Sequence, residues 1–121
     1  MRNILIAVFA ALALCSGVAG AQDTREIKKI DYLISSVENL KGTKFIRNGS
    51  EYTGKEAAEH LRMKLNKAGK RVRTAEDFIR LCASKSYISG KPYMIRTSDG
   101  KTMKSEDYFR EKLKGYNPTA K

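Results

Sequence analysis

The feature that most constrains this 121-residue chain is the apolar segment at its beginning. Arg2 gives the segment a positive start, the run Ile4–Leu14 carries no charge, and Ala19-Gly20-Ala21 offers the small residues that a signal peptidase accepts. A bilayer span needs about 20 apolar residues, and this run stops short at Ser16-Gly17. We therefore expect residues 1–21 to be a cleavable signal peptide. The expected localisation is periplasmic or secreted, with no transmembrane segment after cleavage.

Cleavage would leave residues 22–121 as one small cationic domain of 100 residues with a frayed C-terminal tail. Cys15 leaves with the signal peptide, so Cys82 becomes the only cysteine and an internal disulfide is impossible. Cys82 lies on the apolar side of a predicted helix, where a thiol behaves as a small buried hydrophobe. The domain must then be stabilised by packing alone.

The charge balance narrows the class of partner. The chain has 24 Lys and Arg against 13 Asp and Glu, and loss of Arg2 leaves a net charge of +10 with His60 neutral. An exported protein meets lipid headgroups and anionic cell-wall polymers rather than nucleic acid, and no aromatic platform for single strands is visible. We expect an anionic envelope polymer, a lipid headgroup or an envelope protein as partner. The alternative is that the charge only keeps the domain dispersed.

Apolar residues recur at helical spacing in four segments. We predict helices over 24–41, 54–68, 74 to about 86, and 105 to about 113. Asp23 and Thr53 are each followed three residues later by a glutamate, which predicts two capping boxes, and Thr74 and Ser105 are expected N-caps. Gly42 and Gly69 are expected to end the first two helices.

Short extended segments lie between these helices. Residues 43–47 read as a strand closed by the turn Asn48-Gly49, and residues 93–97 and 101–104 flank the turn Ser98-Asp99-Gly100. Such strands cannot bury a face alone, so the helices must pack on them. The sequence predicts an α+β fold: a small, mainly helical domain of three to four helices on a two- or three-stranded antiparallel sheet.

A basic cluster lies at the end of the second predicted helix and in the loop after it. Lys64, Lys67 and Arg71 would share one side if the helical twist continued past Gly69. Cations near a helix C-terminus also complement its dipole without any ligand. We predict that this cluster binds an anionic partner; its members are Arg62, Lys64, Lys67, Lys70, Arg71 and Arg73.

Catalytic and metal chemistry have weaker support in the residues. Glu56 and His60 are four apart on a helix and can touch, as a carboxylate that orients an imidazole must. A nucleophile would have to come from elsewhere, for example Ser86. A zinc site wants three or four ligands, and one His with one remaining Cys cannot supply them. We therefore predict no metal and no cofactor.

Several short motifs, taken in order, carry a family resemblance over about residues 25–97. They are Phe45-Ile46-Arg47-Asn48-Gly49, Tyr52-Thr53, Glu56-Ala57-Ala58, His60-Leu61, Lys64, Thr74 to Ile79, Ala83-Ser84, Ser86 and Ser89 to Tyr93. Together they resemble the YfeK-like family of small exported bacterial proteins of unknown function. The resemblance marks the polar members as a candidate functional cluster: Arg47, Asn48, Glu56, His60, Lys64, Ser86 and Tyr93. A packing alternative is that Arg47 and Glu56 form an ion pair with His60 hydrogen-bonded nearby.

Three functional hypotheses follow. The first is a non-enzymatic binding or accessory protein that meets an anionic envelope component, favoured by the charge and by the lack of a complete catalytic constellation. The second is a small hydrolase or transferase that uses Glu56 and His60 near Ser86. The third is an inhibitor that presents the Asn48-Gly49 loop or the Gly90–Tyr93 loop to an envelope enzyme.

Overall fold

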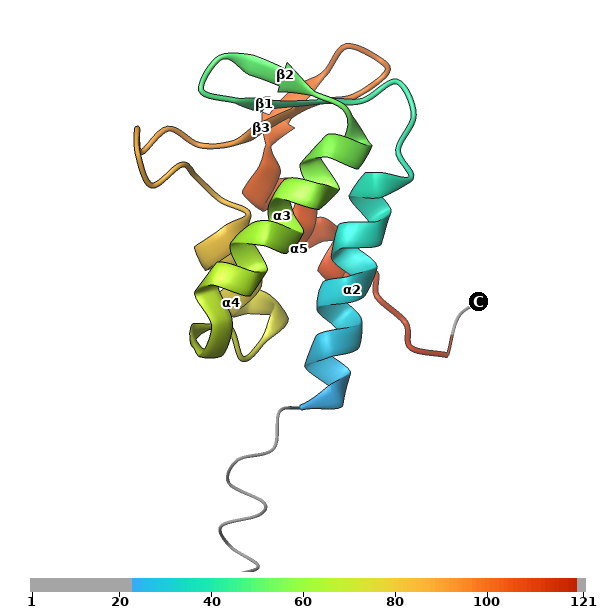
Figure 1. Cartoon of the computed structure of the whole chain (residues 1–121). Coiled ribbons are helices and arrows are strands. Elements are labelled where there is room, and N and C mark those ends of the chain that lie inside the picture. The colour runs from blue at the N-terminus through green and yellow to red at the C-terminus, as the bar shows by residue number, and fades with distance from the viewer. Residues whose placement is uncertain (1–22, 120–121) are drawn as a thin grey trace, which may run out of the picture.

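The computed structural model describes residues 23–119, and the predicted signal peptide at 1–21 lies outside them. In the described part, four α-helices and a four-stranded sheet form an α+β domain (Figure 1). The elements in chain order are α2 (Thr24–Glu38), β1 (Lys44–Arg47), β2 (Ser50–Tyr52), α3 (Gly54–Ala68), a 3₁₀ turn (Gly69–Arg71), α4 (Ala75–Cys82), β3 (Met94–Arg96), β4 (Thr102–Lys104) and α5 (Ser105–Lys114).

The sheet is antiparallel throughout, with strand order β2-β1-β3-β4. The fold class is confirmed, but the prediction of two or three strands was too low. The missed strand is β2, whose residues Ser50-Glu51-Tyr52 carry no alternating apolar pattern. It forms because Asn48 and Gly49 both have positive φ, 50° and 81°, which suits a two-residue hairpin loop.

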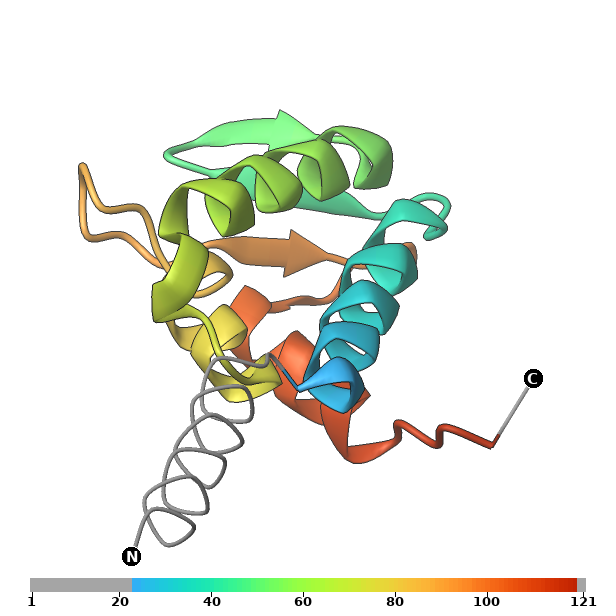
Figure 2. The ribbon, with the colours of Figure 1, turned by 60° about the horizontal axis from the view of Figure 1, so that its bottom comes forward.

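The helices cover one face of the sheet (Figures 1 and 2). Phe45 and Ile95 are cross-strand partners and both are buried against the helices. The ring of Phe109 meets that of Phe78 edge to face, with ring centroids 6.1 Å apart. Cys82 is buried in this core, as predicted.

The predicted N-caps are confirmed for α2, α3 and α4 and wrong for α5, and Asp23 caps α2 by accepting the backbone N–H of Arg25 at 2.9 Å. Thr53 with Glu56 forms a capping box on α3, and Thr74 caps α4 in a box with Asp77. The capping box predicted for Asp23 with Glu26 is wrong, because the Glu26 carboxylate accepts the backbone N–H of Ala75 at 2.9 Å and so binds the start of α4. Ser105 is the first residue of α5 and makes no capping hydrogen bond.

Two helices are shorter than predicted. The first ends at Glu38 rather than near 41, with Asn39 as its C-cap, and Gly42 lies in the loop beyond it. The third ends at Cys82 rather than near 86, because the backbone of Ser84 and Ser86 instead pairs with that of Tyr93 and Lys91. The residues after α4 therefore form a narrow loop.

One close approach fixes how α3 lies against α2. A Cβ atom at Gly54 would be 2.4 Å from the carbonyl oxygen of Val37 and 3.3 Å from that of Leu40. Only glycine fits at this distance from a backbone oxygen. Gly54 therefore lets the start of α3 touch the end of α2, and α3 carries several of the candidate site residues.

Candidate functional site

A groove of about 480 Å³ lies where the β1–β2 hairpin, α3 and the loop after α4 meet. We call it the cationic groove. Its lining residues are Arg47, Asn48, Ser50, Tyr52, His60, Lys64, Lys67, Ala68, Arg71, Leu81, Ser86, Tyr87, Ile88 and Tyr93. Six of the seven residues of the candidate functional cluster are among them, so the fold brings together side chains from positions 47 to 93.

Arg47 and His60 lie against each other at the sheet side of the groove. The guanidinium Nη1 of Arg47 lies 2.8 Å from Nδ1 of His60 and also contacts Nε2, while its Nη2 donates to the Tyr52 hydroxyl at 3.0 Å. Arginine can only donate, so the imidazole accepts and is neutral in this arrangement. Burial, then the nearby charges of Arg47, Lys64 and Lys67, lower the pKa of His60 below its usual value.

Lys64 lies one helical turn after His60 on α3. Its ammonium donates to the hydroxyl of Tyr93 at 2.8 Å and lies 4.7 Å from the centre of that ring. The ring of Tyr87 is 4.9 Å from the same ammonium. These contacts orient the ammonium without neutralising its charge.

Asn48 joins the β-hairpin to the loop after α4. Its side-chain amide donates to Ser86 Oγ at 3.4 Å, and its carbonyl oxygen accepts from the Ser89 hydroxyl. Ser86 is buried, and its Oγ also accepts the backbone N–H groups of Ile88 at 3.2 Å and Ser89 at 3.4 Å. Asn48 and Ser86 therefore hold the loop in place, which is a structural role for both.

The charged side chains that line the groove are all cations. Arg47, Lys64, Lys67 and Arg71 line it, and no carboxylate belongs to the lining residues that the structure describes. Within residues 23–119, none of these four cations takes part in an ion pair. Lys67 reaches the groove from α3 and Arg71 from the 3₁₀ turn Gly69–Arg71, although Gly69 interrupts the helical winding with a φ of 54°.

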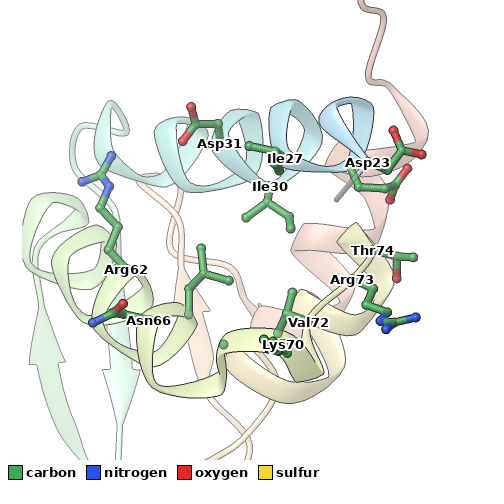
Figure 3. A pocket seen from close by; sticks show the side chains of 13 residues that line it. Asp23, Ile27, Ile30, Asp31, Arg62, Asn66, Lys70, Val72, Arg73 and Thr74 are labelled. Atoms are coloured by element: carbon green, nitrogen blue, oxygen red, sulfur yellow. The ribbon is translucent and has the colours of Figure 1, made fainter. Parts of the chain in front are cut away.

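The rest of the predicted basic cluster faces elsewhere. Arg62, Lys70 and Arg73 line a larger hollow of about 980 Å³ beside α2, together with Asp23, Glu26 and Asp31 (Figure 3). Arg62 also pairs with Glu38 at 2.9 Å. The hollow therefore carries both signs of charge, and the six predicted cations lie on two surfaces of different character.

Glu56 is the one member of the candidate functional cluster that does not line the groove. Its carboxylate accepts the backbone N–H of Thr53 at 2.9 Å, and this contact lowers the pKa of the Glu56 carboxyl. Across the described residues, no hydrogen bond joins Glu56 to His60 and no ion pair joins it to Arg47. The pairings predicted for Glu56 with His60 and with Arg47 are therefore wrong, because the capping box takes up the carboxylate.

Several groove residues were not predicted from the sequence. Tyr52 and Ser50 come from the missed strand β2, and Leu81, Tyr87 and Ile88 come from the end of α4 and its loop. The sequence offered one signal for these residues. Tyr87 and Ile88 are adjacent large apolar residues in a segment where apolar residues do not recur at helical spacing. Within the described part of the chain, no cluster of potential metal ligands occurs.

The part of the chain that the structure covers holds no helix long and apolar enough to cross a bilayer. The family described as a family of unknown function (DUF5329) matches residues 24–117. The chain is also 38% identical over 93 residues to the uncharacterized protein YfeK of Salmonella typhimurium strain LT2, covering 77% of each chain. No solved structure matches it.

Proposed function

The chain belongs to the DUF5329 family of unknown function, and we propose that it is an exported, non-enzymatic binding protein whose cationic groove holds an anionic component of the cell envelope. The matched region, residues 24–117, contains every residue of the groove. The proposal therefore concerns the domain that defines the family.

The observation that carries the proposal is the uncompensated charge of the groove. Four cations converge on it and no described carboxylate lines it, whereas three carboxylates line the hollow beside α2 together with its three cations. Like charges that share a concave surface repel one another and focus the potential there. An anionic ligand would relieve that repulsion.

The groups in the groove suit phosphate, sulfate or carboxylate oxygens. Arg47 offers a planar fork of donors, and Lys64, Lys67 and Arg71 add charge. The hydroxyls of Tyr52 and Tyr93 already take hydrogen bonds from these cations and orient them. Among the groove residues described, no carboxylate or imidazole is paired with a nucleophile, so binding is better supported than catalysis.

The test uses two variants that remove the same charge from different surfaces. Lys67→Gln with Arg71→Gln changes the cationic groove, and Lys70→Gln with Arg73→Gln changes the hollow beside α2. A chain beginning at Gln22 is suitable, because the buried core that the structure describes lies between Ile30 and Phe109. Binding to inorganic polyphosphate is measured by titration calorimetry at low and high salt.

We expect the groove variant to bind polyphosphate roughly 30-fold more weakly, because each cation near an anionic surface contributes about 1 kcal/mol. The hollow variant should lose much less, and binding by the unmodified protein should weaken as salt rises. Equal losses of affinity in both variants would show that only the net charge matters. That result would contradict binding in the cationic groove. Affinity that ignores salt would contradict the electrostatic basis.

A further inference from the structure

We propose that the ligand of the groove is the headgroup of an anionic lipid, bound while the tip Tyr87-Ile88 inserts into the bilayer surface. This inference rests on the proposed function and names the class of its ligand. It starts from Tyr87 and Ile88, the apolar groove residues whose exposure the charge of the groove does not explain.

The tip is apolar and exposed. Residue Ile88 is 97% exposed and Tyr87 is 64% exposed, and both belong to the loop between α4 and β3. This loop projects from the body of the domain in both ribbon views (Figures 1 and 2). Ile88 therefore contributes almost nothing to the core, and its apolar surface is left to water.

The tip is presented by a hydrogen-bonded loop. Ser86 Oγ accepts the N–H groups of Ile88 and Ser89, and the Ser86 carbonyl accepts that of Gly90 at 2.9 Å. Asn48 ties the same loop to the β-hairpin through Ser86 and Ser89. The exposure of Ile88 is thus built into the loop, and a target surface would meet a preformed tip.

The tip and the cations belong to one surface. Tyr87 and Ile88 line the cationic groove, and the Tyr87 ring lies 4.9 Å from the Lys64 ammonium. A tyrosine beside an aliphatic side chain and several cations is the combination that favours the interface of an anionic bilayer, where the ring lies at headgroup depth. A soluble anionic polymer would contact the cations but leave Ile88 in water, so the lipid accounts for both features.

The chain contains no tryptophan, which permits a direct test of insertion. Ile88→Trp places a single fluorophore at the tip, and Ile27→Trp places one on α2, at a residue that is 43% exposed and lines the hollow. Both are made in the chain beginning at Gln22. Each variant is mixed with vesicles of phosphatidylglycerol and phosphatidylcholine, with phosphatidylcholine vesicles as the uncharged control.

With phosphatidylglycerol vesicles, the emission of Ile88→Trp should shift to shorter wavelength and be quenched by brominated acyl chains. The emission of Ile27→Trp should not change, and phosphatidylcholine vesicles should alter neither. Ile88→Asp should weaken vesicle binding at least tenfold, because an aliphatic side chain of this size is worth about one decade in the binding constant. Its affinity for polyphosphate should fall by only about fivefold, because the added carboxylate offsets about one cation of the groove.

Two results would overturn the lipid inference. One is protein bound to phosphatidylglycerol vesicles without any shift in the Ile88→Trp emission. The other is Ile88→Asp that binds these vesicles as well as the unmodified protein does. Neither result affects the polyphosphate comparison between the groove and hollow variants. Anion binding in the cationic groove could therefore be supported even if the lipid inference is refuted.

Discussion

The contact between α2 and α3 permits a quantitative test through Gly54→Ala. The added Cβ would lie 2.4 Å from the Val37 carbonyl oxygen, about 1 Å inside an ordinary contact, and the obstacle is backbone. The first turn of α3 must then move away from the end of α2. Overpacking of this kind costs about 1–3 kcal/mol, which exceeds the gain of less than about 1 kcal/mol that alanine brings to a helix.

We expect a net loss of about 2 kcal/mol in the free energy of unfolding. In a domain of this size that loss lowers Tm by roughly 10 °C, measured by thermal unfolding monitored by circular dichroism. Because α3 carries His60, Lys64 and Lys67, the same displacement should also weaken polyphosphate binding. The effect on binding tests whether the close approach positions the groove.

Gly115→Ala is the matched control. Its added Cβ would lie no closer than 3.7 Å to any neighbour, and its φ of −86° is ordinary for alanine. We expect its Tm to change by less than about 3 °C. If Gly54→Ala were as stable as Gly115→Ala, the two helices could separate freely, and the argument that Gly54 sets the position of α3 would be refuted.

Two further predictions concern single side chains. Because the pKa of His60 is lowered in the folded protein, the unfolded chain takes up the proton first as pH falls through about 6.5, so stability should decrease with falling pH. His60→Gln should flatten that part of the pH profile of Tm; an unchanged profile would contradict the assignment. Burial raises the pKa of the Cys82 thiol, so in a chain beginning at Gln22 a thiol reagent should label Cys82 only as fast as the domain unfolds. Rapid labelling of the native protein would contradict its burial.

Local signals in the sequence predicted the features that depend on local contacts. The capping box of Thr53 and Glu56 spans one helical turn, and the Asn48-Gly49 turn needs only its own two residues. Lys64 and Lys67 face the same groove, as their spacing within α3 predicts. These are contacts or faces within a few residues of the chain.

Contacts between distant segments could not be read in this way. Glu26 caps a helix that begins 49 residues later, and Arg62 pairs with Glu38 across two helices. Strand β2 is held by its partner β1 rather than by its own composition. The division of the basic cluster into two surfaces follows from such contacts, so the sequence could give the cations but not the direction each one faces.

That division also affects how the protein would approach a target. Near α2 the carboxylates offset the field of Arg62, Lys70 and Arg73, while the field of the groove stays uncompensated by its lining. Long-range attraction would therefore turn the domain so that the groove arrives first. Productive encounters would then become more frequent at low salt, while the rate of release would depend mainly on the contacts made afterwards.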